Sequence, residues 1–80
     1  MESNDILKKL NSLFVDTFDN REIVINIETT ALDIEEWDSL THIRLVVAIE
    51  NDFNIRFTSK EIQGWSNVGE MVQCIARKLN

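Results

Sequence analysis

The stretch that most constrains the fold of this chain is residues 39–53, because its apolar side chains fall on two sides of a predicted helix. At about 100° per residue, a first stripe collects Leu45, Val46, Ile49 and Phe53, with Ala48 at its edge. A second stripe on the opposite side collects Leu40, Ile43 and Val47. A surface helix of a small domain needs only one apolar stripe to meet its core. The second stripe therefore indicates a surface that another protein, or another part of this chain, covers.

The residue at the start of this helix is Ser39, which follows Asp38 and precedes Leu40. A helix N-terminus has unpaired N–H groups and a partial positive charge, and both suit a phosphate attached to Ser39. Serine is also a favoured N-cap residue, so a structural role without any chemistry explains the same position. The residues alone leave both interpretations open.

The triplet Asp38-Ser39-Leu40 at a helix start resembles the acyl carrier protein family, and the resemblance covers nearly the whole chain. Further matching positions on the same helix are Ile43, Leu45, Ile49, Glu50 and Phe53. The resemblance implies that Ser39 carries a 4′-phosphopantetheine arm through a phosphodiester, with Asp38 and Leu40 beside the attachment point. The thiol of the arm would hold acyl groups as thioesters, a chemistry that the cofactor supplies and the side chains do not.

The resemblance also implies the partners of the chain and the helix on which they dock. A phosphopantetheinyl transferase would install the arm from coenzyme A, and separate biosynthetic enzymes would load and process the acyl group. The candidate docking residues are Leu40, Ile43, Arg44, Val47 and Glu50. Housekeeping fatty-acid carriers usually have acids just after the motif, where this chain has Thr41 and Arg44. The sequence of residues 37–45 looks more like that of discrete carriers in specialised pathways, such as polyketide, hybrid peptide or surface-glycan assembly. A fatty-acid-like pathway is the alternative interpretation.

Three further helical segments are predicted around this one. Ser3 or Asn4 can cap a first helix that runs to about Phe18. Thr58 and Glu61 match a capping box for a short helix that ends at Gly64, and Ser66 can cap a last helix to about Leu79. The predicted fold is all-α, a small four-helix bundle with three main helices, one short helix and a long loop between the first two.

The long loop, residues 19–38, contains the run Ile23-Val24-Ile25-Asn26-Ile27, which is typical of a strand when taken alone. No second run of this kind exists to pair with it, and a lone strand is not stable. We therefore predict an irregular loop whose apolar residues alternately pack onto the helices. These residues are Ile23, Ile25, Ile27, Leu32 and Ile34. Trp37, where the family commonly has a small residue, is expected to pack under the loop rather than to lie on a partner surface.

Length and composition bound the remaining choices. Eighty residues, 1–80, make a single domain that we expect to be a monomer. A formal net charge of −6 argues against nucleic acid as a partner, because phosphate binding needs a basic patch. Residues 28–38 hold five acids and no base, which favours encounters with basic enzyme surfaces. No apolar run is long enough to span a membrane, and a single cysteine, Cys74, is compatible with the cytoplasm.

The sequence supports an enzymatic or a metal-binding function less well than a carrier function. Asp38, Ser39 and His42 are the residue types of a nucleophilic triad, but a small helical bundle can scarcely build an oxyanion hole and a substrate pocket. A zinc site needs four ligands, mostly cysteine and histidine, and the chain has one of each at distant positions, Cys74 and His42. We therefore expect no catalytic residues and no metal. His42 is interpreted as a partly buried residue on the core side of its helix, and Cys74 as a small packing residue.

Two alternatives to an acyl carrier stay open. A carrier of amino acids or peptides is one, although the peptidyl family usually has glycines before the serine, where this chain has Glu35-Glu36-Trp37. The other is an unmodified helical interaction module that docks through Leu40, Ile43 and Val47. Intact mass separates this module from any carrier, because a chain that is never modified does not gain the arm.

Overall fold

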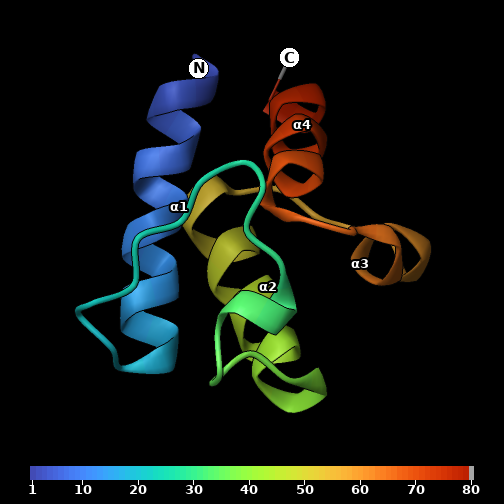
Figure 1. Ribbon diagram of the computed structural model, residues 1–80. Coiled ribbons are helices and arrows are strands. Elements are labelled where there is room, and N and C mark those ends of the chain that lie inside the picture. The colour runs from blue at the N-terminus through green and yellow to red at the C-terminus, as the bar shows by residue number, and fades with distance from the viewer. Residues whose placement is uncertain (80) are drawn as a thin grey trace.

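The computed structural model describes residues 1–79, and its regular elements there are all helical. They are α1 (Ser3–Phe18), the 3₁₀ turn η1 (Ala31–Asp33), α2 (Ser39–Phe53), α3 (Ser59–Gly64) and α4 (Val68–Leu79). α1 contacts both α2 and α4, whereas the short α3 stands out to one side (Figure 1). The predicted small four-helix bundle is confirmed.

The core lies where the apolar stripes of the three long helices meet. Its fully buried aliphatic, aromatic and thioether side chains recur at three- and four-residue spacing along each helix. They are Ile6, Leu10 and Phe14 on α1, Leu45 and Ile49 on α2, and Val68, Met71 and Ile75 on α4. Each such side chain contributes about 1.5–3 kcal/mol by leaving water. The first stripe predicted on α2 therefore faces the core.

The helix boundaries match the predictions, but two of the predicted caps are wrong. α1 already includes Ser3, and Glu2 occupies the cap position without a side-chain hydrogen bond. At α4 the cap is Asn67 and not Ser66, because the Asn67 side chain accepts a hydrogen bond from the backbone N of Glu70 at 2.9 Å. The capping box of α3, from Thr58 to Glu61, is confirmed.

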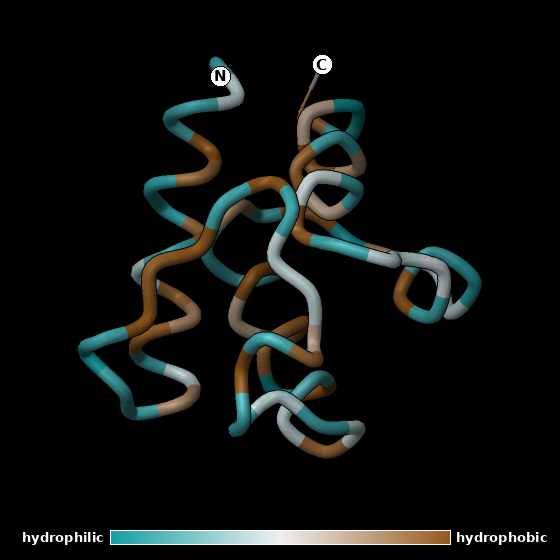
Figure 2. Tube along the Cα trace, viewed as in Figure 1, coloured by the Kyte–Doolittle hydropathy of each residue, from teal (hydrophilic) through white to brown (hydrophobic). Residues whose placement is uncertain are grey.

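The loop between α1 and α2 is irregular, as predicted, and its backbone is fastened to side chains and helix ends instead of a second strand. The side chain of Asn11 on α1 donates to the carbonyl of Ile23 at 3.3 Å and accepts from the N–H of Ile25 at 2.7 Å. At the far end, the backbone N of Val68 donates to the carbonyl of Thr29 at 2.9 Å. The apolar part of the loop that runs along α1 appears brown in Figure 2.

The predicted alternation of loop side chains holds only in part. Ile23, Ile25 and Ile34 are buried in the core, as expected. Ile27 is 59% exposed and Leu32 is 97% exposed, so the prediction is wrong for these two. The conformation of the loop is set by the hydrogen bonds that satisfy its backbone, including those of the η1 turn. These bonds do not place every second side chain on the same side, as a strand would.

Candidate functional site

The start of α2 is capped by Asp38. Its Oδ1 accepts hydrogen bonds from the backbone N–H groups of Leu40 and Thr41, both at 2.9 Å, and the Thr41 hydroxyl accepts from the N–H of Asp38 at 2.8 Å. The hydrogen bond from the Thr41 N–H is the largest cause that lowers the pKa of Asp38, so its carboxylate is charged at neutral pH. The structural role that the sequence left open for Ser39 therefore belongs to Asp38.

Ser39 is the first residue of α2, and its side chain is exposed. It borders an open groove of about 580 Å³ between the start of α2 and α3. The groove lining includes Trp37, His42, Ile43, Ile62 and Trp65. An exposed hydroxyl beside a largely apolar groove has room for a long substituent, so the residues present fit a group attached at this serine.

His42 connects three parts of the site. Its Nδ1 accepts a hydrogen bond from Trp37 Nε1 at 3.0 Å, and its Nε2 donates to the carbonyl oxygen of Ile62 at 3.0 Å. The neutral imidazole with its proton on Nε2 satisfies both contacts. Helical phase predicted a partly buried histidine, which is confirmed, but did not reveal the bridge to α3. Because both nitrogens are engaged and Asp38 caps the helix, these residues do not form a triad with Ser39.

Trp37 packs inward, as predicted. Its ring meets that of Phe14 edge-on, with centroids 5.1 Å apart, and also lies against Phe18. On its other side it stacks on the ring of His42, at 6.0 Å. Trp37 therefore connects the core to the groove beside Ser39.

Comparison with known proteins identifies the family. Residues 9–75 match the family model described as a phosphopantetheine attachment site. An acyl carrier protein from Cyanidium caldarium is 32% identical over 76 residues, covering 95% of this chain and 88% of that protein. The chain belongs to the acyl carrier protein family.

Two other acyl carrier proteins are also similar to this chain over almost its full length. The acyl carrier protein of Petrotoga mobilis is 25% identical over 80 residues, which are 100% of this chain and 94% of that protein. The solution structure of a holo acyl carrier protein from Geobacter metallireducens matches with a TM-score of 0.87 and 39% identity, covering 92% of this chain and 85% of that one. The resemblance inferred from the sequence is confirmed. The chain is a non-catalytic carrier, and its prosthetic group is covalently bound 4′-phosphopantetheine.

The second apolar stripe of α2 is left uncovered by the carrier itself. Leu40 is 74% exposed, and about half the surface of Ile43 and of Val47 is exposed. Arg44 lies among them and is also exposed. Within residues 1–79 no ion pair involves Arg44.

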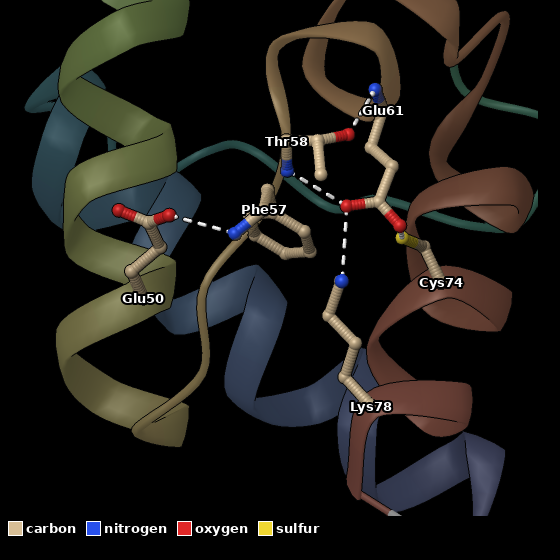
Figure 3. A network of polar contacts seen from close by, with 6 residues as sticks. All are labelled: Glu50, Phe57, Thr58, Glu61, Cys74 and Lys78. Carbon is tan, nitrogen blue, oxygen red and sulfur yellow. Dashed lines mark hydrogen bonds and ion pairs between the residues drawn. The ribbon is translucent and has the colours of Figure 1, made fainter.

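Glu50, the fifth candidate docking residue, has a different role in the structure. Its Oε2 accepts a hydrogen bond from the backbone N of Phe57 at 2.9 Å (Figure 3). Its side chain is only 14% exposed, and its other oxygen lies 3.7 Å from Arg56. The carboxylate therefore holds the segment between α2 and α3, and the docking role of Glu50 stays a prediction.

Three other expectations concern metal, membrane and thiol chemistry. In the part of the chain that the structure describes, no three His, Cys, Asp or Glu residues are grouped to hold a metal ion. No helix among these residues is long and apolar enough to cross a membrane. Cys74 is buried on α4 and burial raises the pKa of its thiol, which agrees with its interpretation as a packing residue.

Proposed function

We propose that this chain is a monomeric, single-domain acyl carrier of the cytoplasm that bears its 4′-phosphopantetheine arm on Ser39. The observation that carries the proposal is the capping of α2 by Asp38, which leaves the neighbouring Ser39 hydroxyl at the surface beside the groove. The positive end of the α2 dipole favours the phosphodiester at this point. Because both His42 nitrogens are engaged, His42 is not available as the base that removes the hydroxyl proton, and the transferase is proposed to supply this base.

The exposed side of α2 is the proposed docking surface for partner enzymes. Leu40, Ile43 and Val47 offer an apolar strip that a complementary groove would cover, and Arg44 adds a positive charge within it. A partner that fits this surface places an acidic group opposite Arg44. This charge favours enzymes of a specialised pathway, such as polyketide, hybrid peptide or surface-glycan assembly, over the basic partners expected for housekeeping fatty-acid carriers.

The deciding experiment is intact mass after incubation with coenzyme A and a broad-specificity phosphopantetheinyl transferase. We expect the native chain to gain one phosphopantetheine and Ser39→Ala to gain none. Ser59→Ala is a matched control, because Ser59 is also an exposed first residue of a helix and lines the same groove. If several transferases leave the native mass unchanged, the unmodified interaction module replaces the carrier as the explanation of the exposed α2 surface.

A further inference from the structure

The short helix α3 is held to the bundle by polar contacts at two sides. From α2, His42 donates to the carbonyl of Ile62, one of the α3 carbonyls that have no partner within the helix. From α4, Lys78 lies 2.9 Å from Glu61, and the Cys74 thiol lies 3.7 Å from the same carboxylate (Figure 3). The position of α3, and with it one side of the groove beside Ser39, therefore depends on a few specific side chains.

Five aromatic rings form a continuous row beneath this groove. From the core outwards they are Phe14, Trp37, His42, Trp65 and Phe57. Successive ring centroids are 5.1, 6.0, 6.0 and 4.8 Å apart, so neighbouring rings are in contact. The three middle rings line the groove, while Phe14 at the inner end is fully buried. We call these three rings, Trp37, His42 and Trp65, the aromatic wall, and it separates the groove from the core.

We propose that the aromatic wall, braced by the two hydrogen bonds of His42, keeps the thioester-bound group in the open groove, so that this carrier holds short acyl groups and does not take long alkyl chains into its bundle. The proposal rests on attachment at Ser39. A long acyl chain that passes through the aromatic wall has to displace the ring of His42 from Trp37 or from Trp65. When His42 moves, the Trp37 N–H or the Ile62 carbonyl loses its hydrogen-bond partner in a half-buried position. His42 is thus a positioning residue for cargo selection.

The chain provides its own reporter for this arrangement. Its two tryptophans are Trp37 and Trp65, both in the aromatic wall, and it contains no tyrosine. Intrinsic fluorescence therefore reports on the aromatic wall and on little else. An acyl chain that passes through the aromatic wall has to change the surroundings of at least one indole, whereas a group that stays in the groove leaves the wall closed.

In the test, the transferase loads the full protein from coenzyme A analogues whose pantetheine arm carries butanoyl or dodecanoyl through a stable amide, and intact mass verifies each product. Melting temperature and tryptophan quenching by iodide are then measured. We expect the native chain to melt at the same temperature with either acyl group and to keep the same quenching. In His42→Ala we expect dodecanoyl to raise the melting temperature above that with butanoyl and to reduce quenching, because the wall can open. Gln63→Ala, which changes the groove lining but not the aromatic wall, should behave as the native chain does.

The native chain alone can overturn the proposal, so the test does not depend on His42→Ala folding well. A dodecanoyl group that raises the native melting temperature above the butanoyl value, and that shields the tryptophans from iodide, would show that long chains enter the bundle. If the native protein gains no mass in the loading step, Ser39 does not accept the arm. This outcome overturns both the proposed function and the cargo proposal.

Discussion

The backbone of Gly69 lies directly against the carbonyl of Ile27. The Gly69 N–H donates to this oxygen at 2.9 Å, and a Cβ on Gly69 would stand only 2.8 Å from the same atom. The backbone of the first turn of α4 therefore contacts the loop between α1 and α2 directly. This contact explains a glycine near the start of a helix, where it otherwise lowers helix stability by about 1 kcal/mol relative to alanine.

Gly69→Ala is expected to destabilise the protein by about 1–3 kcal/mol, because the added methyl group displaces a backbone carbonyl that cannot move freely. Urea unfolding measures this change. Gly64→Ala is the matched control, since a Cβ at the end of α3 meets no atom within 4 Å. Equal stabilities of the two variants would show that the loop can move away from α4 without loss.

The carboxylate of Glu61 is predicted to make stability depend on pH in the acid range. The hydrogen bond from the Thr58 N–H and the contact with Lys78 lower the pKa of Glu61 from 4.5 to about 2. Because the pKa is lower in the folded state, the contribution is fully present above pH 4.5 and is lost as the pH falls towards about 2. The difference in stability between Glu61→Gln and the native protein should therefore be largest above pH 4.5 and smallest near pH 2.

Melting temperature as a function of pH measures the effect of Glu61. Glu2→Gln serves as the control, because Glu2 is exposed and its side chain makes no capping hydrogen bond. If the curves of Glu61→Gln and the native chain run parallel through the acid range, the pKa of Glu61 is not lowered by folding.

Leu40→Ala is expected to slow loading by the transferase several-fold while changing stability by less than about 0.5 kcal/mol, because the side chain is mostly exposed. Loading rates and thermal melting on the same samples separate the two effects. Leu45→Ala, on the buried side of the same helix, should instead cost about 2–5 kcal/mol. A large drop in melting temperature for Leu40→Ala would place Leu40 in the core.

Arg44→Glu is expected to raise severalfold the loading rate with a transferase that normally serves fatty-acid carriers, because it puts an acid where the basic surface of such an enzyme meets α2. The increase should be in the association step and should shrink at high salt. Unchanged or slower loading would contradict the interpretation of Arg44 as a determinant of partner choice. Arg44→Gln, which removes the charge without reversing it, should give an intermediate rate.

Local patterns were sufficient to predict the helices and much of the site. The burial of Leu45 and Ile49 follows from their spacing on one helix, and the end of α3 at Gly64 follows from short-range signals. The exposure of Leu40 on the opposite side of α2 follows from the same arithmetic. These features depend on neighbours within one or two helical turns, which is why the sequence is sufficient to predict them.

Other features depend on partners far apart in the chain, and periodicity carries no information about those. The side chain of Asn11 holds the backbone of Ile25, 14 residues away, and His42 meets the carbonyl of Ile62, 20 residues away. The residue type suggested Ser39 as the cap of α2, whereas in the structure Asp38 is the cap, because aspartate and serine are both favoured at this position. The sequence by itself therefore determined the helices and the family of this protein. Only the tertiary structure decided how the loop is fastened and how the aromatic wall closes, because each depends on polar groups that meet only when the helices pack.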